Sequence, residues 1–332
     1  MKTAQAQAAL APPSLLGSLR AGFDATANHL GLLLIPVLLD LYLWLGPHLR
    51  LDQLVDGIVS GDNRQPSFTN PETAELLQFS GQYWSLFAER LNLFSAFRSY
   101  PVGTPSLMVV SQPITTPYGA PASWQVPSLA SSIGLWLILF LTGLVIGTVY
   151  FSLVSQVVLT GKFSLRETLS RLPWASLQVF KLALYFIVFV VMLTLPLSCL
   201  ASLLVLTGLP VGQLSLILFF ALAAWMFLPF LFSPHGIFIL QHPARASIRE
   251  SFRMTRATLP KTVALFLLIV AIDEGLSILW LVPEGHSWLT FISVLGHAFV
   301  VTGLVAASFV YYRDANRWLQ RLLQQAQLSS IP

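Results

Sequence analysis

Four ionisable residues of this chain stand inside long apolar runs, where a charged group is unusual. Asp40 lies in the middle of "IPVLLDLYLWL", Asp273 and Glu274 lie in "LIVAIDEGLSILW", and His297 falls in a third run. A charge at the centre of a bilayer costs about 2.5–3.5 kcal/mol on insertion scales, so such residues often have a function. Together a carboxylate and a histidine can form a proton relay or a cation site. The alternative is an interhelical hydrogen bond or, for Asp273 and Glu274, contact with outer headgroups and water.

The rest of the chain has no pattern typical of a catalytic site. It contains no phosphate-binding glycine loop, no Gly-x-Ser-x-Gly elbow and no HExxH motif. The other histidines are scattered without the spacing of metal ligands. The basic segments lack the stacking aromatics and the overall charge of a nucleic-acid binder. We therefore expect no enzyme, no catalytic residue, no cofactor, no metal and no nucleic-acid partner.

The composition indicates an integral membrane protein. Of 332 residues, 55% are hydrophobic and only 10% are charged, too few charges to cover a soluble domain of this size. A hydrocarbon core of about 30 Å requires roughly 20 apolar residues in a helix. Runs of that length predict an all-α, polytopic membrane protein with six transmembrane helices at about 30–49, 131–157, 177–206, 211–239, 262–282 and 289–312.

The basic residues predict the orientation of these helices. Of the 18 Lys and Arg residues, 14 fall in the leader, in two connections and in the tail, which six spans place on one side. The positive-inside rule makes that side the cytoplasm. We therefore expect a multi-pass protein of the bacterial inner membrane with both termini in the cytoplasm.

The segments between and beyond the spans complete the predicted organisation. Residues 1–29 are a cytoplasmic amphipathic leader, residues 313–332 are a cytoplasmic amphipathic tail, and residues 131–312 contain the last five spans. Residues 50–130, called the insert below, lie outside the cytoplasm. Asn70 and Pro71 predict the start of a helix in the first half of the insert, and six prolines predict turns in the second half.

A charged phrase occurs twice, as "SLRETLSR" from Ser164 and as "SIRESFRM" from Ser247. In each, a Ser followed three residues later by a Glu predicts a capping box at a helix start. A weaker copy begins at Ser18. These elbows precede spans that run outward, and we expect their basic residues to contact anionic lipid headgroups: Arg166, Arg171, Arg249, Arg253 and Arg256. The alternative is a site for a phosphorylated substrate.

A second repeated phrase occurs in two of the predicted spans that run back toward the cytoplasm. "TGLVIG" contains Gly143 and Gly147, and "TGLVAA" contains Gly303 and Ala307. Small residues four apart let helices approach closely, either within one chain or in a dimer. The echoes predict three pseudo-repeated units, each with an elbow, an outward helix and an inward helix, and the insert belongs to the first unit. The alternative is that similar topology selects similar phrases.

The order of these features resembles a known group. A basic "ARASIRESFRMTRATLPKTVALFLLIV" before an outward helix and a last span closing in "FVYYRDANRW" are similar to poorly characterised bacterial six-helix membrane proteins. These include the membrane domain attached to some glycerophosphoryl diester phosphodiesterases. The resemblance covers mainly residues 131–318, implies a fold more than an activity, and gives no catalytic residues.

Two functional hypotheses follow from the sequence. The first is a non-enzymatic scaffold or accessory subunit that contacts membrane lipids and binds a protein partner through the insert at residues 50–130. The second is a transporter or permease for a small or lipid-like solute, with Asp40 and either Asp273 or Glu274 along the path. A membrane enzyme ranks third, because no nucleophile, base and oxyanion donors gather in the sequence.

Overall fold

The computed structural model describes residues 12–61, 88, 91–206, 221–223, 226–227 and 230–329, most of which are helical. The elements before the long helices are α2 (Leu15–Ala27), the 3-10 helix η1 (Leu30–Leu33), α3 (Leu34–Leu45), β1 (His48–Arg50), α4 (Asp52–Gly61), the 3-10 helix η2 (Leu93–Phe97), α6 (Met108–Ser111) and β2 (Ser123–Gln125). The remaining elements are α7 (Leu129–Thr160), α8 (Leu165–Leu206), α10 (Ser233–Ile239), α11 (Ala244–Ala257), α12 (Leu259–Trp280) and α13 (Leu289–Ser329).

Four of these helices, α7, α8, α12 and α13, are long and apolar enough to cross a membrane. The number rises to five if the bent pair of α2 with Leu30–Leu45 is counted as one span. The mostly helical fold, with helices long and apolar enough to cross a membrane, is therefore confirmed. The count of six stays a prediction, because about half of the expected span at 211–239 lies outside the described residues, which include α10 at its end.

The first predicted span is shorter than expected. The sequence predicts a helix over residues 30–49, but α3 ends at Leu45 and the chain becomes extended at Gly46. The 16 residues of η1 and α3 are about 25 Å long, less than the roughly 30 Å of a hydrocarbon core. Gly46 and Pro47 follow Leu45, and β1 starts at His48 and pairs in parallel with β2.

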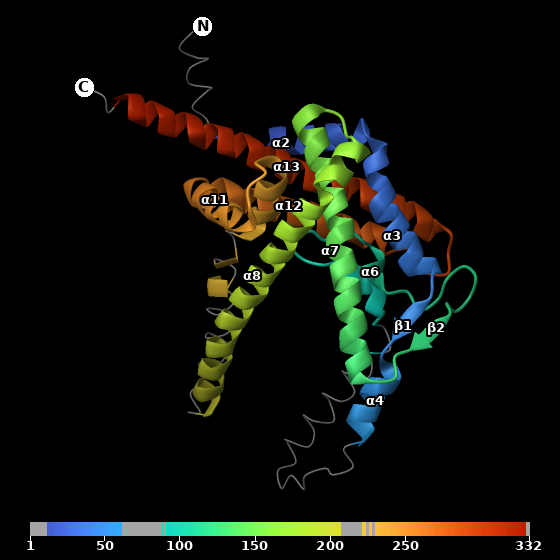
Figure 1. The fold of residues 1–332 in the computed structure, drawn as a ribbon. Coiled ribbons are helices and arrows are strands. Elements are labelled where there is room, and N and C mark those ends of the chain that lie inside the picture. The colour runs from blue at the N-terminus through green and yellow to red at the C-terminus, as the bar shows by residue number, and fades with distance from the viewer. Residues whose placement is uncertain are drawn as a thin grey trace.

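The long helices pack unequally. In both α7 and α13, half of the most apolar window is buried, and the Tyr150 hydroxyl of α7 donates a hydrogen bond of 2.9 Å to the Thr302 hydroxyl of α13. In α8 and α12 only 11% of that window is buried. Figure 1 shows α8 diverging from α7 away from their connection. The apolar faces of α8 and α12 are those of helices in contact with lipid.

Helix α2 lies at the same end of the molecule as α11 and the connection between α7 and α8 (Figure 1). The axis of α2 makes an angle of 88° with the segment Leu30–Leu45. It packs on α13, where a Cβ on Gly22 would lie 2.3 Å from the Ala307 nitrogen. Gly303 and Ala307 therefore serve packing within the chain.

Of the two predicted capping boxes, the one at Ser164 forms in part and the one at Ser247 does not form. At Ser164 the Oγ accepts the Glu167 N–H at 3.4 Å, but the Ser164 N–H donates to Gln156 instead of Glu167. Ser247 is not a cap: α11 begins at Ala244, and the buried Ser247 hydroxyl donates to the Ser233 carbonyl of α10.

The third phrase also differs from its expected role. The N-cap of α2 is Ser14, whose Oγ accepts the Gly17 N–H, while Ser18 lies inside the helix. The elbows differ in form as well. The phrase at Ser247 lies in α11, a helix separate from the long helix α12 that follows it. The phrase at Ser164 instead forms the first turns of the long helix α8 itself. These differences leave the threefold repeat a prediction.

Candidate functional site: a polar cluster around Arg98

The Asp40 side chain is fully buried and binds the insert. One carboxylate oxygen accepts the Ser106 hydroxyl and the Met108 N–H, and the other accepts the Leu107 N–H; both N–H bonds are 3.0 Å long. These amides belong to the start of α6, where helical N–H groups have no partner within the helix. Asp40 thus fastens α3 to the insert with three hydrogen bonds.

The part of the insert that Asp40 holds lies among the long helices. Residues 97–108, called the inner segment below, are mostly buried, with Val102 and Thr104 completely so. The Gly147 Cα faces this segment so closely that a Cβ would lie 1.8 Å from the Val102 carbonyl oxygen. A Cβ on Gly143 would lie 2.5 Å from the Phe97 oxygen. The small pair of α7 therefore receives a loop, not a helix.

Arg98 places a guanidinium group in this segment. It interacts electrostatically with Asp40, with Asp273 of α12 and with His297 of α13. Its Nη1 also donates a long hydrogen bond of 3.5 Å to the Ser106 carbonyl oxygen. The inner segment therefore brings one cation to three of the four ionisable residues that the sequence singles out.

The acidic pair of α12 is less enclosed than Asp40. Asp273 is half-buried and Glu274 is exposed, and the two carboxylates interact electrostatically with each other. A 22-residue α12 places both residues about 10 Å from its end at Trp280. The proximity of Arg98 compensates charge at Asp273, while Glu274 lies on an outer face of the helix.

His297 is the most enclosed member of the cluster after Asp40, with 6% of its surface exposed. Its Nδ1 is buried and, within the described part of the chain, has no hydrogen-bond partner. A buried ring nitrogen without a partner loses the free energy of a hydrogen bond. The Nδ1 position of His297 is therefore either unfavourable or a point at which a proton or a ligand can bind.

The cluster can compensate charge, and two of its members can still take part in chemistry. Both carboxylate oxygens of Asp40 accept hydrogen bonds from the insert. Asp273 and His297 are therefore the members of the cluster that can still accept a proton. Among residues 12–61, 88, 91–206, 221–223, 226–227 and 230–329, no three His, Cys, Asp or Glu side chains gather as metal ligands.

Sequence reasoning did not single out Arg98, an exposed residue of the insert whose neighbours lie far away in the sequence. Its run "SAFRSYPVGTPS" reads as an exposed turn. The glycines of α7 predicted a close neighbour but not its identity. The elbow arginines, by contrast, lie on exposed helix faces, where Arg171 pairs with Glu167 at 3.2 Å and Arg253 with Glu250 at 2.8 Å.

His48 lies just before the insert, and folding alters its titration. It is buried at the start of β1, with Nε2 3.2 Å from the Leu43 carbonyl oxygen. Burial lowers the pKa of the imidazole and nearby Arg50 lowers it further, whereas the bond to Leu43 opposes both. The neutral ring is therefore the form that suits the folded insert.

No protein-family model, no curated protein and no solved structure matches this chain. The resemblance to the six-helix membrane proteins stays a prediction, and the function must be argued from the residues themselves.

Proposed function

We propose that the chain is a non-enzymatic membrane protein of the scaffold or accessory-subunit type. It contacts a protein partner through the outer surface of its insert. The observation that carries this proposal is the hydrogen bonding of Asp40, which uses the most buried carboxylate to hold the inner segment in place. A carboxylate in a solute path has to exchange partners, whereas Asp40 has three fixed donors from the chain.

The insert also presents aromatic side chains that its own fold does not cover. Tyr118 is 78% exposed, Trp124 is 57% exposed, and Trp288 of the neighbouring connection is 55% exposed. The rings of Tyr118 and Trp288 meet edge to face at 5.5 Å. Exposed Tyr and Trp on a fixed backbone supply contact area at a low entropic cost, as at the centre of protein interfaces.

The finer topology is part of the same proposal. We place six spans and three pseudo-repeated units in the bacterial inner membrane, with both termini in the cytoplasm and the aromatic side chains of the insert outside. The distribution of Lys and Arg supports this orientation. The position of α2, α11 and the C-terminal part of α13 at one end of the molecule also supports it (Figure 1).

Deleting the whole insert is a poor test, because the inner segment is part of the core and its removal would unfold the protein. A sharper experiment introduces a photo-crosslinking amino acid at Tyr118 or at Trp124 in native membranes. Ile138, an exposed residue on α7, is the matched lipid-facing control. We expect one protein adduct of the same mass at 118 and 124 and none at 138.

Crosslinks to lipid alone at positions 118, 124 and 138 would contradict the scaffold proposal. That result would make Tyr118 and Trp124 members of an aromatic belt at the membrane surface. A second variant, Tyr118→Ser with Trp288→Ser, should reduce the adduct formed from position 124 at least tenfold if the aromatic pair contributes to the partner site.

A transporter is the second candidate, and Asp273 and His297 beside Arg98 are the observation that favours it. The test is proton flux into proteoliposomes under an imposed gradient. A relay predicts at least a tenfold loss for Asp273→Asn and less than a twofold change for the exposed neighbour Glu274→Gln. Equal flux in Asp273→Asn, Glu274→Gln and the unmodified protein would remove the relay.

A further inference from the structure

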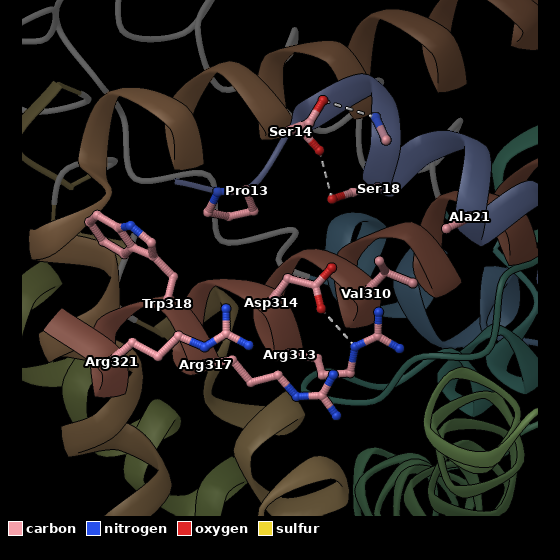
Figure 2. Close-up of a pocket in the computed structure, with 11 residues that line it drawn as sticks. Pro13, Ser14, Ser18, Ala21, Val310, Arg313, Asp314, Arg317, Trp318 and Arg321 are labelled. Carbon is pink, nitrogen blue, oxygen red and sulfur yellow. Dashed lines mark hydrogen bonds and ion pairs between the residues drawn. The ribbon is translucent and has the colours of Figure 1, made fainter. Parts of the chain in front are cut away.

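A cavity of about 410 Å³ separates the first half of α2 from the last part of α13. Figure 2 shows its two walls. Pro13, Ser14, Ser18 and Ala21 form one wall, and Arg313, Arg317, Trp318 and Arg321 form the other. This cavity lies at the opposite end of the molecule from the insert and uses none of the residues of the Arg98 cluster.

The packing of α2 explains why the cavity exists. The two helices touch at Gly22, where the backbone of α2 meets Gly303 and Ala307 of α13. The cavity residues of α2 all precede Gly22, and those of α13 all follow Ala307, so the cavity lies along one side of the interface between the two helices. The start of α2 is held in place too, because the Lys261 Nζ donates to the Pro12 and Pro13 carbonyls at 3.1 and 3.2 Å.

The α13 wall carries an excess of positive charge. Arg313, Arg317 and Arg321 follow one another at intervals of four residues and thus share a helix face, where like charges repel. Asp314 is the acidic residue in the wall, and its Oδ1 accepts the Nε of Arg313 at 2.8 Å. Arg313 also donates to the Val158 carbonyl at 2.7 Å, so its guanidinium is held by the protein.

The other two arginines have different surroundings. Arg317 and Arg321 are exposed and, among the residues that the structure describes, have neither a hydrogen bond nor an ion pair. The positive end of α2 also begins in this cavity, at the cap residue Ser14. Two unpaired guanidinium groups in a cavity with a net positive charge favour a ligand with phosphate oxygens, which arginine binds in a bidentate manner.

We propose that this cavity binds the phosphodiester headgroup of an anionic membrane lipid, with Arg317 and Arg321 donating to its phosphate oxygens. The volume lies in the range of small-ligand clefts and suits a headgroup, while the acyl chains remain outside in the bilayer. Trp318 in the same wall is a residue type enriched at the level of lipid headgroups. The site is distinct from the exposed elbow arginines, which lie on α8 and α11.

The test titrates the full-length protein in neutral detergent with dioctanoyl phosphatidylglycerol and counts bound lipid by native mass spectrometry. We expect R317Q/R321Q to raise the Kd at least tenfold. The matched control K162Q/R245Q removes the same charge from exposed residues outside the cavity and should change the Kd less than twofold. R317K/R321K keeps the charge but not the fork of donors, so an intermediate loss is expected.

Two further probes identify the source of the phosphate. Inorganic phosphate and dioctanoyl phosphatidylcholine should each bind at least tenfold more weakly than the anionic lipid. Equal affinity of inorganic phosphate would overturn the lipid in favour of a free anion, and equal affinity of the zwitterionic lipid would overturn the charge selectivity. An unchanged Kd in R317Q/R321Q, or an equal loss in K162Q/R245Q, would overturn the cavity as the site.

Discussion

The pairs Gly143–Gly147 of α7 and Gly303–Ala307 of α13 share one sequence phrase but receive different partners. The α7 pair holds the backbone of the inner segment, whereas the α13 pair holds α2. On α7 the neighbour is an irregular loop whose amides need partners from outside, and Asp40 supplies them. On α13 the neighbour is a helix that satisfies its own backbone. A small-residue pair therefore predicts a close approach but does not predict what approaches.

The largest loss of stability is expected when the inner segment loses its hydrogen bonds to Asp40 of α3. Asp40→Ala leaves the Ser106 hydroxyl and the Leu107 and Met108 amides buried without their acceptor. Each such group costs about 1–3 kcal/mol, so the free energy of unfolding should fall by roughly 4 kcal/mol. Chemical unfolding of the purified protein in neutral detergent measures this loss.

Asp40→Asn is the control for this prediction, because it keeps the shape of the side chain and one acceptor oxygen. About half of the loss is expected. A loss below about 1 kcal/mol in Asp40→Ala would mean that the hydrogen bonds do not hold the inner segment in place.

The next effect tests the contact on α7. Gly147→Ala places a Cβ within 1.8 Å of the Val102 carbonyl oxygen, and backbone on both sides prevents easy relief. Overpacking of this kind typically costs 1–3 kcal/mol, and we expect about 3 kcal/mol here. Gly134→Ala, in the same helix with open space around its Cβ, should instead stabilise by about 0.5–1 kcal/mol. Equal stability of the two variants would contradict the loop contact.

A Gly-to-Ala substitution at the contact between α2 and α13 should lower the free energy of unfolding by less. Gly22→Ala brings a Cβ to 2.3 Å from the Ala307 nitrogen, so α2 must move away from α13. Because α2 can shift as a rigid helix at the edge of the molecule, we expect a loss of about 2 kcal/mol. The unfolding free energy of Gly22→Ala should therefore lie between those of Gly147→Ala and Gly134→Ala. A larger loss than that of Gly147→Ala would reverse the comparison.

Sequence patterns predicted the long apolar helices but not the depth of the insert. Hydropathy identifies α7, α12 and α13 because a spanning helix satisfies its backbone locally. The position of Arg98 depends on the close contact between the inner segment and Gly143 and Gly147, which is a tertiary contact with no local signature.

The capping boxes illustrate the same limit at short range. The pattern Ser-x-x-Glu at Ser247 is complete, but Pro243 already ends the preceding turn and starts α11 one turn earlier. Gly236 of α10 then lies against the Ser247 side chain, whose hydroxyl bonds to Ser233. At Ser164 no neighbouring helix competes for the hydroxyl, and the predicted cap forms. Tertiary contacts thus decide which of two equal phrases acts as a cap.

The smallest effect concerns the protonation of His48, just before the insert. Because folding lowers the pKa of His48, the unfolded chain takes up a proton near pH 6.5 while the folded chain does not. The stability conferred by the neutral ring is complete above about pH 6.5 and decreases as the pH falls below that value toward the lowered pKa of the folded state. Unfolding free energies of the unmodified protein and of His48→Asn between pH 5 and 8 measure this contribution as their difference. A difference that stays constant with pH would mean that His48 titrates alike in both states, and that the β1 end of the insert is more open to water than the packing of α3 against it implies.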